Sequence, residues 1–141
     1  MMRKTLLLVI LWLLVDVSGA AEQDARQLVK LPKMMQAHML GSMRDHLQTI
    51  HEIQTALAKG ESDRAADIAE ARLGMSSLVA HNASHMAPYM PKAMQETGTE
   101  MHHAASRFAL TAKEGDLTRT LGDLAKVTQQ CVACHAAYRI R

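Results

Sequence analysis

Aromatic residues are the scarcest large side chains in this sequence. Its 141 residues include one Trp, two Tyr and one Phe. The single Trp, Trp12, lies in an N-terminal apolar run that we expect to be removed, so three aromatic side chains remain for the rest of the chain. A hydrophobic core with so few rings leaves room for a large ring that is not an amino acid.

Glycine and proline are also scarce, and neither sign of charge is in large excess. Seven Gly and three Pro, with few β-branched residues, do not fit an all-β fold with many turns. A net charge of +2 provides no broad basic field for nucleic acid. A hydrophobic content of 48% is too high for a disordered chain. The composition favours a helical domain without a nucleic-acid partner.

The N-terminus has the layout of a secretory signal peptide. A basic start (Arg3, Lys4) precedes an apolar run from Leu6 to Val15 and a small-residue tail that ends at Ala20. That run is shorter than the roughly 20 apolar residues that span a bilayer, so an uncleaved anchor is the weaker alternative. We therefore predict a leader at residues 1–20, one exported domain at residues 21–141, a bacterial periplasmic location and no membrane insertion after cleavage.

Two cysteines occur, as Cys131-Val132-Ala133-Cys134 followed at once by His135. A structural zinc site needs a second ligand pair, and the sequence has no other cysteine. A thioredoxin-type dithiol belongs beside a βαβ pattern, which is not seen before this motif. C-x-x-C-H is the attachment signature of c-type haem, with two thioethers and an imidazole that ligates iron. Positions i, i+3 and i+4 share one helix face, so all three groups could meet one flat macrocycle.

The pattern of apolar residues predicts four helices. They are expected over residues 32–59, which begin at Pro32 and stop at Gly60; over residues 63–83 after the cap Ser62; over residues 92–114 between Pro91 and Gly115; and over residues 117–138 after the cap Asp116. Short connections make neighbouring helices antiparallel. The sequence therefore predicts an all-α, antiparallel up-down-up-down four-helix bundle, while residues 21–29 are left open as a frayed lead-in or an early helical turn.

The C-terminal stretch from Cys131 to Arg139 reads C-x-x-C-H-x-x-Y-R. This ending resembles the class II c-type cytochromes, the cytochrome c-prime family and its low-spin relatives. The resemblance implies one covalent haem c, His135 as the proximal iron ligand and Arg139 near the haem edge, where an ordinary charge at a helix end is the alternative. It also leaves open a homodimer formed through the first two helices.

The family divides by what occupies the sixth position of the iron. A methionine from the first helix gives a low-spin electron carrier, whereas a bulky apolar residue leaves five-coordinate iron that binds nitric oxide or carbon monoxide. Residues 31–36 lack the family's usual Arg-Gln pair. Because the end of the fourth helix should face the start of the first, Met35 or Met39 is the expected sixth ligand; a plain core role for both remains the alternative.

A third hypothesis comes from the density of Met and His at the same end of the predicted bundle. His81 and His85 are spaced i, i+4, as in helical metal sites, and soft Met ligands suit copper. The alternative is a solvated helix face. For His46, His51, His102 and His103 we expect surface or core positions only. Since no catalytic constellation is visible, the sequence predicts a periplasmic electron carrier that meets redox partner proteins, rather than an enzyme.

Overall fold

A computed structural model describes residues 24–141, so the leader predicted at residues 1–20 lies outside the described part of the chain. The elements in chain order are β1 (Gln27–Leu28), α1 (Lys33–Ala58), α2 (Ser62–Arg72), the 3-10 turn η1 (Met75–Ser77), α3 (Ala83–Met86), the 3-10 turn η2 (Ala87–Tyr89), α4 (Lys92–Ala112), α5 (Leu117–Ala137) and β2 (Tyr138–Arg139). The fold is mostly helical, with five helices packed together rather than the four expected.

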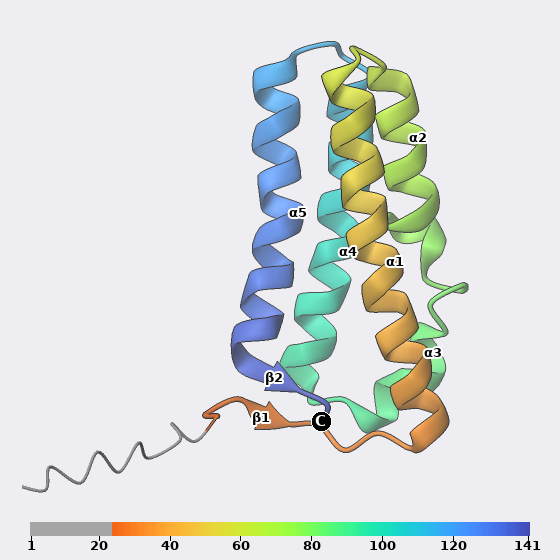
Figure 1. The fold of residues 1–141 in the computed structure, drawn as a ribbon, viewed down its shortest axis with the longest axis vertical. Coiled ribbons are helices and arrows are strands. Elements are labelled where there is room, and N and C mark those ends of the chain that lie inside the picture. Colours follow the sequence, from red (N-terminus) through yellow and green to blue (C-terminus); the bar gives the residue numbers. More distant parts are fainter. Residues whose placement is uncertain (1–23) are drawn as a thin grey trace, which may run out of the picture.

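The long helices run along one axis and alternate in direction (Figure 1). α1 rises from the lower end, α2 descends from the upper end, α4 rises again and α5 returns to the lower end. The closest packing is between α4 and α5, between α1 and α2, and between α2 and α4. The first and last long helices, α1 and α5, are not closely packed against each other.

Several helix ends follow the local signals in the sequence. α1 begins directly after Pro32 and ends before Gly60, whose φ of 76° is the left-handed conformation that stops a helix. α4 begins after Pro91, and Gly115 (φ 81°) lies in the turn that follows it. The Asp116 side chain accepts a hydrogen bond from the Arg119 amide at 3.0 Å, which caps α5.

The second predicted helix is wrong in its second half. It was expected to continue to residue 83, but α2 ends at Arg72. Gly74 takes an extended conformation, and a Cβ there would lie 2.3 Å from the Glu70 carboxylate. That carboxylate accepts hydrogen bonds from the hydroxyls of Ser76 (2.9 Å) and Ser106 (2.6 Å). These side-chain bonds hold the chain in a non-helical course, and a separate short helix, α3, follows near the lower end (Figure 1).

The hydrophobic core is formed by residues of α1, α2, α4 and α5. More than half of its members are alanines, which let the helix backbones approach closely, and its fully buried large side chains are Phe108, Ile53, Leu73 and Val127. The three- and four-residue spacing of apolar residues predicts that α1 buries Leu47, Ile53 and Leu57. Ile53 and Leu57 are buried, but Leu47 is 73% exposed and Thr49 is buried instead. α1 buries no side chain before Thr49, and α5 buries none after Val127.

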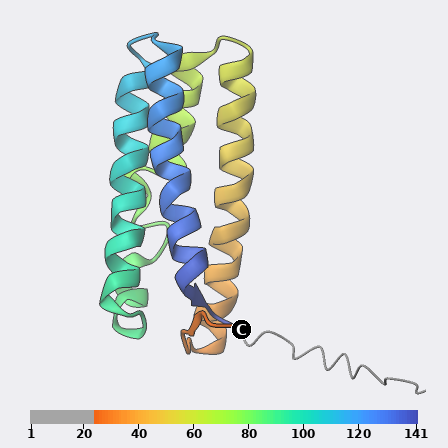
Figure 2. The ribbon, with the colours of Figure 1, turned by 90° about the vertical axis from the view of Figure 1, so that its left-hand side faces the viewer.

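The described part of the lead-in, residues 24–29, is not helical, and Gln27–Leu28 within it form the strand β1. β1 pairs in parallel with β2, with Gln27 opposite Tyr138 and Leu28 opposite Arg139. The Val29 amide adds a hydrogen bond to the Arg139 carbonyl at 2.7 Å, and Val29 is 3% exposed. Tyr138 and Arg139 therefore do not continue the helix as predicted; together β1 and β2 form a strap across the lower end of the molecule (Figures 1 and 2).

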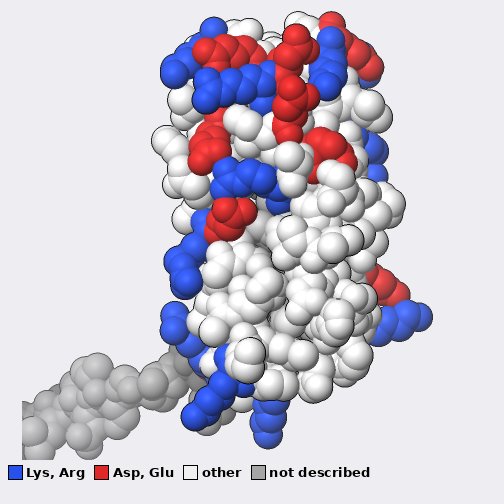
Figure 3. All heavy atoms as spheres, turned by 90° about the vertical axis from the view of Figure 1, so that its right-hand side faces the viewer, with Lys and Arg blue, Asp and Glu red and all other residues white. Residues whose placement is uncertain are grey.

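Charged side chains gather mainly over the upper end, and the lower part of the same face is largely uncharged (Figure 3). Arg72 joins α2 to α1 through ion pairs with Asp45 and Glu52, and Lys113 pairs with Asp67. None of the helices in residues 24–141 combines the length and the apolar character needed to cross a bilayer.

Candidate functional site

The C-x-x-C-H motif lies in the last two turns of α5, at the lower end of the molecule. Cys131 packs against the edge of the core, and its thiol lies 3.6 Å from the Val127 carbonyl oxygen. Cys134 is also half-buried, and the two thiols are free. Helical spacing places Cys131, Cys134 and His135 on one face of α5. The three groups therefore share the arrangement that covalent haem attachment requires.

The surroundings of the thiols disfavour a redox dithiol. Burial raises the pKa of Cys131, and burial together with the neighbouring Cys131 raises the pKa of Cys134. Catalytic dithiols depend on the opposite shift, because the thiolate is the nucleophile. This environment suits thiols that form one permanent covalent bond better than thiols that are repeatedly oxidised and reduced.

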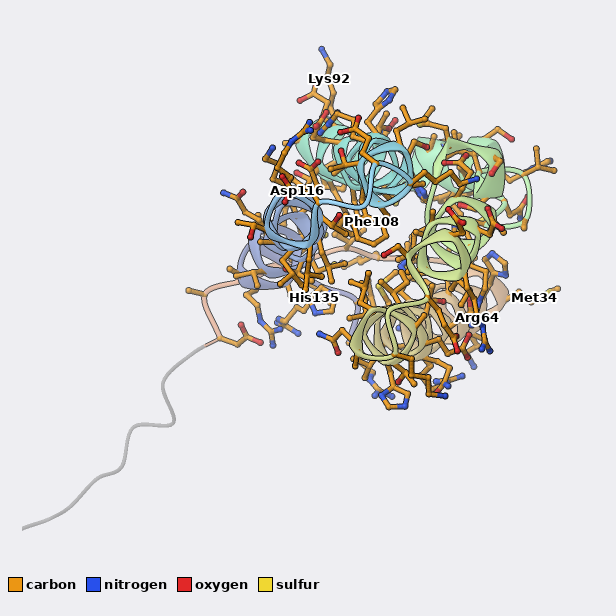
Figure 4. All side chains as sticks on the ribbon, turned by 90° about the horizontal axis from the view of Figure 1, so that it is seen from above. Met34, Arg64, Lys92, Phe108, Asp116 and His135 are labelled. Carbon is orange, nitrogen blue, oxygen red and sulfur yellow. The ribbon has the colours of Figure 1, made fainter. Side chains whose placement is uncertain are left out.

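Two methionines of α1, Met35 and Met39, are placed at the same end of the molecule. Both are half-buried. Viewed along the molecule's long axis in Figure 4, His135 lies on the side of α5 toward α1, whereas Met34 points outward. Met34 is 87% exposed, and His38 is engaged with the His81 carbonyl at 3.0 Å. The structure thus brings Met35 and Met39 to the end that carries His135, without distinguishing between them.

The lower halves of α1 and α5 carry half-buried apolar side chains, which together are named the apolar seam. In Figure 2, α5 crosses from the side of α4 toward the side of α1 as it descends, yet α1 and α5 do not pack closely. Met35, Met39 and Met43 on one helix and Cys131 and Cys134 on the other are only half-buried. Apolar side chains are normally covered in a folded protein, so these half-buried side chains leave apolar surface that another apolar group could cover.

Arg139 lies in β2 beside this seam, and not one helical turn beyond His135. Its buried Nε lies 3.5 Å from the Asp24 carboxylate, an ion-pair contact that lacks hydrogen-bond geometry within residues 24–141. A haem carboxylate would therefore have to share this donor with Asp24. The donor set of two thiols and one imidazole is the part that fits a covalent haem.

The predicted pair of His81 and His85 does not form a common site. The chain between them is not a continuous helix, because Asn82 has a φ of 54° and starts α3. His85 is exposed, whereas the His81 ring meets the rings of His46 and His102.

This three-histidine cluster was missed in the sequence. Thr49 and Ile53 are buried, and His46 precedes them at helical spacing, so His46 lies on the buried face of α1. The expectation that Leu47 is buried hid this signal. His102 is next to Met101 on a buried stretch of α4. The pairing of these two histidines with His81 depends on the turn after η1, where a continuous helix to residue 83 was wrongly expected. Within residues 24–141 no three His, Cys, Asp or Glu side chains are already arranged around a metal position.

No family model, curated protein or solved structure matches this chain.

Proposed function

We propose that this protein is an exported monohaem c-type cytochrome of the class II kind that carries single electrons. The observation that carries the proposal is the C-x-x-C-H motif at the end of α5, on a helix face that contributes half-buried side chains to the apolar seam. Neither feature alone would be sufficient, because a five-residue motif can occur by chance and half-buried apolar side chains are common. Together they supply the attachment points for a haem and an apolar surface beside them.

The residues have separate tasks in this proposal. Cys131 and Cys134 would hold the porphyrin through thioethers, and His135 would give the iron one axial imidazole. Haem iron supplies reversible exchange of one electron between its ferrous and ferric states. Met35 or Met39 would approach from α1, where either thioether would complete the iron coordination and favour the ferrous state. The apolar side chains of the seam would exclude water, and the Arg139 Nε would donate to a haem carboxylate.

The remaining parts of the proposal concern architecture and location. We infer that α1, α2, α4 and α5 correspond to the four helices of the class II bundle, with α3 and the two 3-10 turns as an elaborated connection. Their alternating directions along one axis support this correspondence. Export to the periplasm rests on the leader at residues 1–20, and electrons would pass to and from other periplasmic redox proteins.

Covalent attachment is tested by producing the chain with the haem-attachment machinery and measuring its mass. We expect the added mass of one haem in the wild type and none in the Cys131→Ser, Cys134→Ser double variant. Val132→Ala is the matched control, because Val132 lies between the cysteines but is 69% exposed, and it should keep the haem. A wild-type chain that emerges without haem would refute the proposal.

The sixth position is tested by the optical spectrum of the ferrous protein with and without carbon monoxide. An electron carrier should give a sharp low-spin spectrum that the gas does not change. Met35→Ala and Met39→Ala, made separately, should then show which residue is the ligand, since only one variant should become high-spin. A wild type that is high-spin and binds the gas would instead favour a binder of diatomic gases.

A further inference from the structure

Three histidine rings meet in the interior although they come from three distant parts of the chain. His46 belongs to α1, His81 to the turn after η1 and His102 to α4. The ring centroids of His46 and His81 are 4.7 Å apart, those of His81 and His102 are 5.2 Å apart, and those of His46 and His102 are 6.4 Å apart. His102 is buried, and the other two are half-buried.

The hydrogen bonds around the rings fix where two of their protons lie. The Ser77 hydroxyl donates to the Gly74 carbonyl at 2.7 Å, so its contact of 3.4 Å with His81 Nδ1 requires the imidazole to be the donor. His102 Nδ1 lies 2.7 Å from the Leu73 carbonyl, which can only accept. Both rings therefore carry their proton on Nδ1. The unprotonated Nε2 of His81 accepts a hydrogen bond from His46 Nε2 at 3.3 Å in the absence of an ion, and a metal ion would replace that proton.

This is the pattern of metal-ligating histidines, which hold their outer N–H against a carbonyl or another fixed acceptor. Neutral imidazole ligates a metal through its unprotonated nitrogen.

The spacing of the nitrogens selects a coordination geometry. His46 Nε2 and His81 Nε2 are 3.3 Å apart. Two nitrogens at about 2.05 Å from a tetrahedral Zn²⁺ lie roughly 3.3 Å from each other. Neighbouring ligands of a square-planar Cu²⁺ at a similar bond length lie only about 2.8 Å apart. The observed separation therefore matches a tetrahedral ion.

A route to this position exists from the surface. An open hollow of about 370 Å³ reaches His81 and is lined by His38, Asp45, Arg72 and Ser77 among others. The positive charge of Arg72 is balanced by Asp45 and Glu52, so it does not leave an uncompensated charge to repel an entering cation.

We propose that His46, His81 and His102 form a binding site for a tetrahedral divalent metal ion, with Zn²⁺ as the ion that fits. His46 and His81 already have the required separation. His102, whose ring centroid lies 5.2 Å from that of His81, would have to rotate about its Nδ1–H bond to the Leu73 carbonyl to supply the third nitrogen. Water fills the fourth position, as in open zinc sites. None of Cys131, Cys134, His135, Met35 and Met39 takes part, so the site is independent of haem attachment.

Equilibrium dialysis against Zn²⁺ tests the site, with protein matured alongside the haem-attachment machinery and stripped with chelator beforehand. We expect one Zn²⁺ per chain, with affinity lowered about tenfold or more in His46→Gln, His81→Gln and His102→Gln. Exposed histidines of the same helices, His51 in α1 and His103 in α4, provide the matched controls, and His51→Gln and His103→Gln should bind as the wild type does. The Cys131→Ser, Cys134→Ser chain should also keep its Zn²⁺, which separates this site from free thiols and from any failure to attach haem.

Thermal unfolding with and without Zn²⁺ separates lost binding from lost folding. A variant that still unfolds cooperatively but gains no stability from the ion has lost the site alone, because a ligand stabilises only a state that binds it. Unchanged Zn²⁺ affinity in both His46→Gln and His81→Gln would overturn the proposal. Binding of Cu²⁺ with none of Zn²⁺ would overturn the tetrahedral assignment.

Discussion

The upper and lower halves of the molecule are packed in different ways. In the upper half, Phe108, Leu124 and Val127 are buried with closely packed alanines, and the surface above them carries paired charges. In the lower half, Met86 and Met94 are buried, but the methionines of α1 and the cysteines of α5 that form the apolar seam are only half-buried. Amino-acid side chains complete the upper half by themselves. The half-buried methionines and cysteines of the lower half could line a site for a bound apolar group, which is the physical basis of the haem proposal.

Substitution in the two halves should give very different stability losses in the haem-free chain. Phe108 is 0% exposed, so Phe108→Ala should cost about 3 to 5 kcal/mol. Met39 is half-buried, and Met39→Ala should cost about 1 kcal/mol or less because its surroundings are not tightly packed. Urea unfolding of both variants measures the difference. Equal losses would mean that the lower half is already a finished core.

Removal of haem should affect the two halves unequally. We expect amides of α1 before Thr49 and of α5 after Val127 to exchange with solvent at least about tenfold faster without haem, since few buried contacts then hold them. Amides near Phe108 should change little. Hydrogen exchange followed by mass spectrometry, on wild type and on the Cys131→Ser, Cys134→Ser chain, makes the comparison. Uniform protection in both samples would contradict it.

The N-terminus of α5 belongs to the well-ordered upper end and should respond as an ordinary helix cap. Asp116→Ala removes the acceptor of the Arg119 amide and should lower the free energy of unfolding by about 1 kcal/mol. Asp116→Asn keeps an equivalent acceptor and is the control. A loss shared by both variants would indicate a role for the charge rather than the cap.

The strap at the lower end should show the smallest effect, which depends on pH. The side-chain hydrogen bond from Arg26 lowers the pKa of Asp24 from 3.8 to about 2. A carboxyl with a lowered pKa stabilises the fold above its unfolded value and loses that contribution as pH falls through the folded value. Protection of the Val29 amide should therefore weaken between about pH 4 and pH 2. In Asp24→Asn this step should be absent, and a step that persists would assign it to another group.

Local signals in the sequence were enough for the ends of most helices. Pro32, Gly60, Pro91 and Asp116 act on the backbone within a few residues, so their effect on α1, α4 and α5 could be read without the fold. The end of α2 could not be read in this way. It depends on Glu70 accepting hydrogen bonds from Ser76 and from Ser106, and Ser106 lies on another helix.

The residues of the candidate site can also be divided into those whose placement follows from local spacing and those whose placement depends on distant parts of the chain. The motif of Cys131, Cys134 and His135 is local, so its shared helix face followed from spacing alone. The strap is a pairing between the two ends of the described chain, and periodicity within a segment cannot reveal it. The cluster of His46, His81 and His102 likewise needs three separate elements to meet. The sequence could show that each residue type was present, but not which ones would converge.

The parallel pairing of β1 with β2 also has a consequence for the order of folding. Its partners, Leu28 and Arg139, are separated by nearly the whole described chain, and contacts between such distant residues carry the largest entropic cost of loop closure. The neighbouring helix pairs α1–α2 and α4–α5 should therefore assemble earlier. During that interval the end of α5, which carries Cys131 and Cys134, would be a formed helix that is not yet joined to β1.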